Sequence, residues 1–63
     1  MSKFNIEVEV PFGDNAYAIM GTVQKALKKA GATKEQLSEY FTESTSGDYD
    51  HLMQVACDWV VAV

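Results

Sequence analysis

The chain has 63 residues, with five lysines, no arginine, one cysteine and one histidine, and a formal net charge of −4 at pH 7. One cysteine excludes an internal disulfide and suits a reducing cytosol, and the few Cys and His residues offer no structural zinc site. Because phosphate and base recognition rely heavily on arginine, an ordinary basic nucleic-acid binder is disfavoured. We expect one domain over residues 1–63, stabilised by a compact core, by homodimer formation, or by both.

Residues 4–10, FNIEVEV, alternate apolar and polar side chains. This period of two predicts a half-buried strand, which Pro11 and Gly13 then end. The apolar side chains that face the core are Phe4, Ile6, Val8 and Val10. We expect no secretory signal peptide at this end, because no long apolar run is present, and no membrane span anywhere in the sequence.

A helix is indicated next by apolar residues at spacings of three and four. They are Ala16, Ile19, Met20, Val23, Leu27 and Ala30. Asp14 is placed to cap the start of this helix, and Gly31 is placed to end it in the left-handed conformation. Gly21 lies mid-helix, where glycine costs up to about 1 kcal/mol relative to alanine. Either another backbone packs closely there, which we favour, or the cost is tolerated.

A second helix is predicted to begin after Thr33 and to end near Ser44. Thr33 and Gln36 have the spacing of a capping box, and the turn-forming composition of STSG ends the helix. A short apolar face is formed by Leu37, Tyr40 and Phe41.

The same helix carries an acidic ridge of Glu35, Glu39 and Glu43, spaced four residues apart. Like charges at this spacing cost a few tenths of a kcal/mol per pair, so helix stability alone does not select them. Two interpretations are open. The ridge is either a solvated face that keeps a small protein in solution, or a negative surface that binds a basic partner or imitates nucleic-acid phosphates.

Residues 48–63, DYDHLMQVACDWVVAV, combine a helical pattern with a strand pattern. Leu52, Val55 and Trp59 share one helical face with Ala56, which predicts a helix from about residue 48 to residue 58. The β-branched end predicts a short strand over residues 59–63. A lone strand cannot satisfy its backbone hydrogen bonds, so we expect residues 59–63 to pair with residues 4–10. Pairing between two copies is the fallback.

Together the elements predict an α+β fold in the order strand, helix, helix, helix, short strand. The predicted core consists of Phe4, Ile6, Val8, Val10, Ile19, Met20, Val23, Leu27, Leu37, Phe41, Leu52, Val55 and Trp59. We expect the indole N–H of Trp59 to find a carbonyl or a water molecule. Cys57 is expected to be partly buried and unreactive, because Asp58 adjoins it and no lysine is near in sequence.

Residues 44–51, STSGDYDH, contain the residue types of an active site. Ser44 or Ser46 with His51 and an aspartate matches the types of a hydrolase triad, but a triad is defined by its geometry. Asp48, Asp50 and His51 could supply metal ligands, but on a helix Asp48 and His51, three residues apart, are the pair that could meet, and two ligands make a weak site. We therefore assign no catalytic, cofactor-binding or metal-binding residue.

A helix start explains the same stretch completely. Gly47 makes the turn, and Ser46 or Asp48 caps the first N–H groups of the last helix. Asp48 and Asp50 lie in the first turn, where carboxylates interact favourably with the helix dipole. We therefore interpret residues 44–51 as a turn.

The segment ESTSGDYDHLMQVACDWV resembles a recurring pattern in small uncharacterised proteins encoded by bacteriophages and prophages. In these proteins an acidic helix leads into a Ser-Gly-Asp-Tyr-Asp turn, and an apolar helix ending in Trp-Val follows. The match is clearest over residues 41–60, and no activity goes with it. The resemblance implies a small cytosolic protein made in an infected or lysogenic bacterium.

These observations predict a non-enzymatic phage or prophage protein that binds a host or phage protein in the bacterial cytoplasm. The candidate partner-binding residues are Glu35, Glu39, Glu43, Tyr40, Asp48 and Asp50, which favour a basic partner. One alternative is an acidic inhibitor that covers the nucleic-acid-binding surface of a host defence or DNA-binding protein, and another is a small hydrolase that uses His51. If the acidic residues are not used, we expect the interface among the exposed aromatics Tyr17, Tyr40 and Tyr49. No cofactor, direct nucleic-acid contact or membrane contact is expected.

Overall fold

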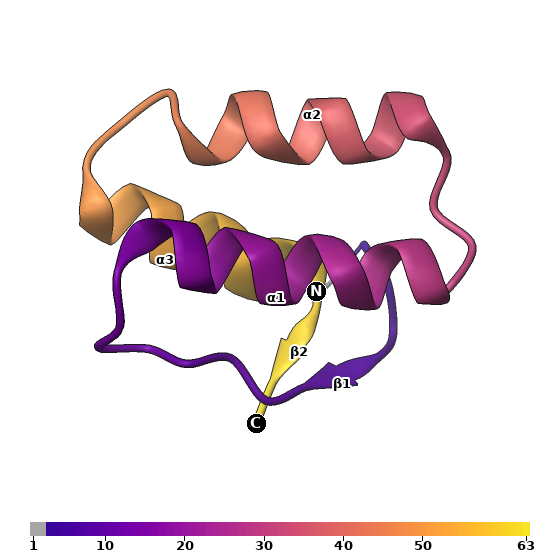
Figure 1. Ribbon diagram of the computed structural model, residues 1–63, viewed down its shortest axis with the longest axis horizontal. Helices are drawn as coiled ribbons and strands as arrows, with labels where there is room; N and C mark the ends of the chain where they lie inside the picture. Colours follow the sequence, from indigo (N-terminus) through magenta and orange to yellow (C-terminus); the bar gives the residue numbers. More distant parts are fainter. Residues whose placement is uncertain (1–2) are drawn as a thin grey trace.

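Two short strands from opposite ends of the chain pair with each other and bring those ends together (Figure 1). The computed structural model describes residues 3–63. Its elements are β1 (Glu7–Val8), α1 (Ala16–Lys29), α2 (Lys34–Ser44), α3 (Tyr49–Trp59) and β2 (Val61–Ala62). The predicted α+β order is confirmed, and so is the pairing of the last strand with the first.

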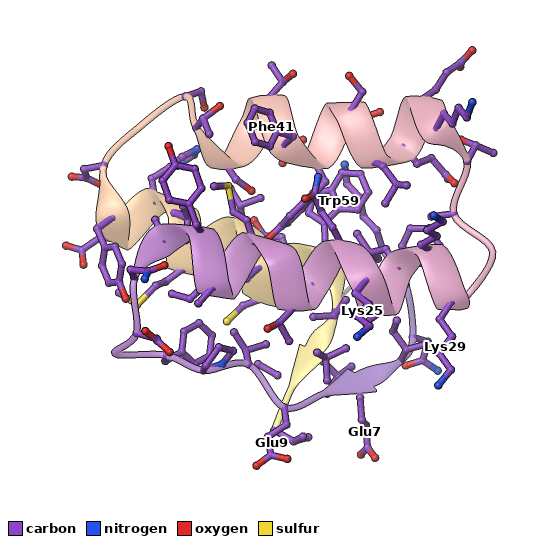
Figure 2. All side chains as sticks on the ribbon, in the orientation of Figure 1. Glu7, Glu9, Lys25, Lys29, Phe41 and Trp59 are labelled. Carbon is purple, nitrogen blue, oxygen red and sulfur yellow. The ribbon has the colours of Figure 1, made fainter. Side chains whose placement is uncertain are left out.

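The two strands run parallel, with Glu7 opposite Val61 and Val8 opposite Ala62. Parallel strands need a long crossover connection, and here α1, α2 and α3 together form it. Figure 2 shows Glu7 and Glu9 pointing away from the helices, as the alternation of FNIEVEV predicts.

Backbone hydrogen bonds extend this pairing beyond the regular strands. The amide of Phe4 donates to the carbonyl of Trp59 at 2.8 Å, and the amide of Val61 donates to the carbonyl of Ile6 at 2.8 Å. The amide of Val63 donates to the carbonyl of Val8 at 3.0 Å. The regular strands are shorter than the predicted residues 4–10 and 59–63. The last strand begins late because Trp59 still belongs to the last turn of α3.

The helices pack on one another, and the sheet lies on the side of α1 and α3 that is remote from α2 (Figure 1). The buried core consists of Val8, Val10, Ile19, Met20, Val23, Leu27, Tyr40, Leu52, Val55, Ala56, Trp59 and Val60. Phe4, Ile6 and Leu37, also predicted for the core, are partly buried against it. Cys57 was expected to be partly buried but is exposed, because it lies outside the stripe of Leu52, Val55 and Trp59 on α3.

The ends of α1 follow the capping rules, with one residue different from the prediction. Asn15, not Asp14, is the N-cap: its backbone is extended, and its side chain accepts the amide of Ala18 at 2.8 Å. The Asp14 carboxylate instead accepts the amide of Asn15. At the other end Gly31 takes a positive φ of 95°, as predicted, and the amide of Ala32 donates to the carbonyl of Leu27. This 6→1 bond completes a Schellman motif.

Two further expectations concern α1 and α2. Close packing against Gly21 was wrong, because a Cβ built there would meet nothing within 4 Å. The cost of glycine at this position is therefore tolerated. The capping box at the start of α2 is confirmed: Thr33 Oγ1 accepts the amide of Gln36, and the Gln36 side chain accepts the amide of Thr33.

Tyr40 is buried and Phe41 is exposed, the reverse of what was expected from the sequence. Tyr40, expected among the exposed aromatics and as a partner-binding residue, is 0% exposed, whereas Phe41, expected in the core, is 46% exposed. The Tyr40 ring packs edge-on against Trp59, with centroids 5.5 Å apart and an interplanar angle of 72°. Tyr40 and Phe41 lie three and four residues after Leu37, so both spacings fit the helical face of Leu37. The contact of Tyr40 with Trp59 determines which of the two rings is buried.

Trp59 occupies the centre of the core and is 1% exposed. Phe4 stacks on it with ring centroids 6.1 Å apart. Its indole N–H approaches the Glu43 carboxylate, with Nε1 3.4 Å from Oε1, rather than the expected carbonyl or water. Figure 2 shows Trp59 between α1 and α2, whereas Phe41 lies at the surface of α2.

We predict that Val61→Pro destabilises the domain by about 1–3 kcal/mol, because proline removes the amide that donates to Ile6 and leaves that carbonyl unpaired. Ala62→Pro is the matched control. In a parallel pair alternate residues bond to the same neighbour, so the amide of Ala62 points away from β1. Urea unfolding of both variants measures the difference. Equal losses would show that the pairing at Val61 adds nothing.

Candidate functional site

The acidic ridge of α2 lines an open groove of about 570 Å³. The structure brings Glu35, Glu39 and Glu43 together there with Ser38, Thr42 and Ser46. It places Asp48 elsewhere, as the N-cap of α3, and Asp50 in the first turn of that helix. The predicted partner-binding residues therefore do not all line this groove.

Lys3 lies across two of the three ridge glutamates. Its Nζ is 3.3 Å from Glu39 Oε1 and 3.7 Å from Glu43 Oε2, and it stands 4.4 Å from the centroid of the Trp59 ring. Exposed ion pairs of this kind contribute little to stability, and a cation over an aromatic face contributes modestly. The main effect of the Lys3 ion pairs is on the charge of the ridge. The ridge is partly neutralised from within the chain, which weakens it as an imitation of nucleic-acid phosphates.

The STSGDYDH stretch does bring its serine and histidine together. Ser46 Oγ lies 3.1 Å from His51 Nε2, and both atoms also reach the carbonyl oxygen of Glu43 in the last turn of α2. The distance to that oxygen is 2.7 Å from Ser46 Oγ and 3.0 Å from His51 Nε2. Asp48 accepts the backbone amide of His51, not its ring, at 2.9 Å.

The shared carbonyl decides the roles of Ser46 and His51. A carbonyl can only accept hydrogen bonds, and the Ser46 hydroxyl donates to that of Glu43. The Ser46 hydroxyl proton is thus directed at this carbonyl, and Asp48 bonds the backbone of His51 and not its ring. The pair closes the exposed end of α2, where helix carbonyls lack internal partners, and Asp48 caps α3 as the turn interpretation predicted.

Gly47 provides space for this turn. Its φ is not positive, but a Cβ added to it would lie 2.8 Å from His51 Cγ and 2.9 Å from Cβ and Cδ2. We predict that Gly47→Ala destabilises the domain by about 1–3 kcal/mol through this overlap. His51→Ala removes the ring atoms and should recover part of the loss in the double variant. Thermal unfolding of the four proteins tests this, and an equal loss in both backgrounds would contradict it.

Two buried hydroxyls lie side by side on α2, on the helical face that packs inward. Tyr40 Oη and Ser44 Oγ are both covered, and neither makes a hydrogen bond of good geometry within residues 3–63. Burial raises the pKa of Tyr40 above its ordinary value of 10, and the Ser44 hydroxyl one turn away opposes that rise. The folded chain therefore holds Tyr40 protonated more firmly than the unfolded chain does.

Tyr40→Phe keeps the contact with Trp59 and removes a buried hydroxyl without a good partner. We predict that stability at neutral pH is unchanged or rises by about 1 kcal/mol. Because folding raises the pKa of Tyr40, the hydroxyl's contribution to wild-type stability is full below pH 10 and is lost as the pH increases above 10. Tyr40→Phe lacks this titration and should lose less stability at alkaline pH. Tyr17→Phe, at an exposed position, is the control. A loss above about 1 kcal/mol in Tyr40→Phe would show that the hydroxyl is well bonded.

A second open groove lies where α1 begins, α2 ends and α3 begins. Tyr17, Phe41 and Tyr49 line it and are 80%, 46% and 39% exposed, and the buried side chains of Met20 and Leu52 line it from inside. Its volume is about 340 Å³. We call this feature, defined by these five residues, the aromatic groove. The groove has an apolar floor and exposed aromatic walls. This combination is typical of surfaces that bind other molecules.

One wall of the aromatic groove is fixed by a long-range hydrogen bond. The Tyr49 hydroxyl donates to the carbonyl of Asp14 at 2.6 Å, which ties α3 to the loop before α1. Tyr17 and Tyr49 were anticipated as exposed aromatics, whereas Phe41 was missed because it had been placed in the core. The signal that could have found it is the pair Tyr40-Phe41, of which one helix face can bury only one ring.

Comparison of the chain with protein-family models, with curated proteins and with solved structures gave no match. Among residues 3–63, no three His, Cys, Asp or Glu side chains are grouped so that they could hold a metal ion. Over the same residues, no helix combines the length and the apolar character that crossing a bilayer requires.

Proposed function

We propose that this chain is a small non-enzymatic protein of phage or prophage origin that acts in the bacterial cytoplasm by binding another protein through the aromatic groove. The resemblance of residues 41–60 to phage and prophage proteins supports the origin. The aromatic groove carries the binding proposal, because it gathers exposed rings from three helices at one place.

Folding alone does not account for the exposed rings of Tyr17 and Phe41, whereas Tyr49 also ties α3 to the loop before α1. Tyr17 stands 80% exposed in the first turn of α1, where a polar residue would serve the helix as well. Phe41 and Tyr49 lie on the other two helices and yet line the same groove. Tyrosine and other aromatic residues are enriched at the energetic centres of interfaces, since they supply large contact areas at low entropic cost.

A protein that binds in the aromatic groove should no longer bind when Tyr17 and Phe41 are replaced by serine. The tagged wild-type protein and a Tyr17→Ser, Phe41→Ser variant are each used to recover proteins from phage-infected cells, and the recovered proteins are quantified by mass spectrometry. Both substituted side chains are substantially exposed, so the variant should remain folded. We expect the amount of recovered partner to fall more than tenfold in the variant, because removing interface hot spots weakens binding by this much.

Two control variants make this result specific. Phe12→Ser removes an aromatic ring of similar exposure, 43%, which does not line the groove, and it should retain the partner. Replacing Glu35, Glu39 and Glu43 by glutamine tests the acidic ridge. A partner that the groove variant retains and the glutamine variant loses would move the interface to the ridge and overturn the proposal.

A further inference from the structure

The outer edge of β1, the edge away from β2, has backbone groups that no strand pairs with. The carbonyls of Ile6 and Val8 accept amides from the last residues of the chain, so these two residues face β2. In a parallel pair alternate residues bond to the same neighbour, and the backbone amides and carbonyls of Glu7 and Glu9 therefore point the other way. Within residues 3–63 nothing hydrogen-bonds to these four groups.

Two adjoining open hollows, of about 270 and 450 Å³, lie between β1 and one face of α1. On α1 they are lined by a single stripe of Thr22, Lys25, Ala26, Lys29 and Ala30. Ile6 lines the hollow that reaches Ala30, and Glu9 lines the hollow that reaches Thr22. The strand therefore runs along α1 in the opposite direction, rather than across it (Figure 1). Unpaired backbone groups next to open space are what an added strand requires.

Lys25 and Lys29 give this surface a positive charge. Both side chains are exposed and line the larger hollow, and the ion pairs among residues 3–63 involve neither of them. Figure 2 shows the two lysines on the side of α1 toward β1, whereas Glu7 and Glu9 point away from the helices. The lysines are one helical turn apart, about 6 Å along the axis. Alternate residues of a strand are separated by nearly the same distance, about 6.6 Å.

A second copy of the chain is a poor occupant of this edge. A two-fold symmetric pair of β1 edges would run antiparallel and would place the same residues of both copies side by side. Glu7 and Glu9 of one copy would then lie opposite those of the other. Like charges directly opposite each other destabilise a pair of strands, so a partner with different side chains is favoured.

We infer that the outer edge of β1 takes an extended segment of a partner protein as a third strand. Two acidic side chains of that segment, with one residue between them, face Lys25 and Lys29. The residue between them lies beside Glu7 and Glu9, so it is basic or neutral. This surface shares no lining residue with the aromatic groove, and binding at one does not require binding at the other.

Selection from a displayed library of random short peptides, against the immobilised full chain, provides the probe. Peptides that bind the Glu9→Pro variant equally well are discarded, because proline removes the outward amide of Glu9. An edge strand tolerates proline where the N–H faces solvent, and thermal unfolding checks that the variant is folded. We expect the remaining peptides to share two Asp or Glu residues separated by one residue.

One selected peptide is synthesised, and its dissociation constant is measured by fluorescence anisotropy. Glu9→Pro should weaken binding about tenfold or more, whereas Glu9→Thr, which keeps the amide, should not weaken it. Lys25→Gln, Lys29→Gln should weaken binding about three- to tenfold, as expected for two exposed charge pairs. Lys28→Gln, Lys34→Gln makes the same change of charge away from the hollows and should leave binding unchanged.

Amide hydrogen exchange of the wild-type protein with the peptide separates strand addition from simple charge attraction. The amides of Glu7 and Glu9 should exchange at least tenfold more slowly in the complex, because an added strand accepts their hydrogens. This measurement needs no substitution, so it decides the matter even where the proline variant is unstable.

Three results would overturn the inference and leave the aromatic groove unaffected. The first is a selection in which no peptide depends on the Glu9 amide. The second is a peptide that needs Lys25 and Lys29 but leaves the exchange of Glu7 and Glu9 unchanged. The third is a concentration-dependent dimer in sedimentation that disappears in Glu9→Pro, which would assign the edge to a second copy.

Discussion

The burial of Trp59 is the interaction on which the rest of the structure depends. Its ring meets Phe4 from the beginning of the chain and Tyr40 from α2, while its backbone carbonyl accepts the amide of Phe4. It is also the last residue of α3, directly before the buried Val60 and strand β2. Removing such a ring costs about 3–5 kcal/mol, a large part of the stability of a small domain.

The ion pairs around Trp59 follow from the same position. Because the chain ends meet at this residue, Lys3 is carried over the indole face and within reach of Glu39 and Glu43. The acidic ridge is therefore altered by a residue 36 positions away from Glu39 in the sequence. The aromatic groove is lined by other residues of α2, Phe41 and Ser44, and no lysine lines it.

Local rules account for most of the fold that could be predicted. The period of two in residues 4–10, the capping box of Thr33 and Gln36, and the left-handed Gly31 each depend on neighbours in sequence, and each is present. Asp14 and Asn15 are both residue types that cap helices, so their sequence alone does not distinguish them, and Asn15 is the one that accepts the amide of Ala18. The parallel direction of the strands was not predictable, since it depends on how three helices return the chain.

The candidate site was harder to anticipate, for a related physical reason. The residue types suggested a pair of Ser46 and His51, and the two side chains do lie together. Both also contact the Glu43 carbonyl, which no reading of residue types could reveal. The choice between Tyr40 and Phe41 required knowing where Trp59 lies. The aromatic groove combines the ends of three helices, so no stretch of sequence displays it as a unit.

The paired chain ends that meet at Trp59 are an integral part of the folded domain that holds the helices around the groove. Amide hydrogen exchange followed by NMR tests it most directly, because it measures the opening free energy of each backbone bond. The amides of Phe4, Val61 and Val63 should exchange only through global unfolding, with the same opening free energy as those of Val23 and Val55 in the helical core. Exchange of the three strand amides at the rates of fraying ends, while the two core amides stay protected, would contradict the account.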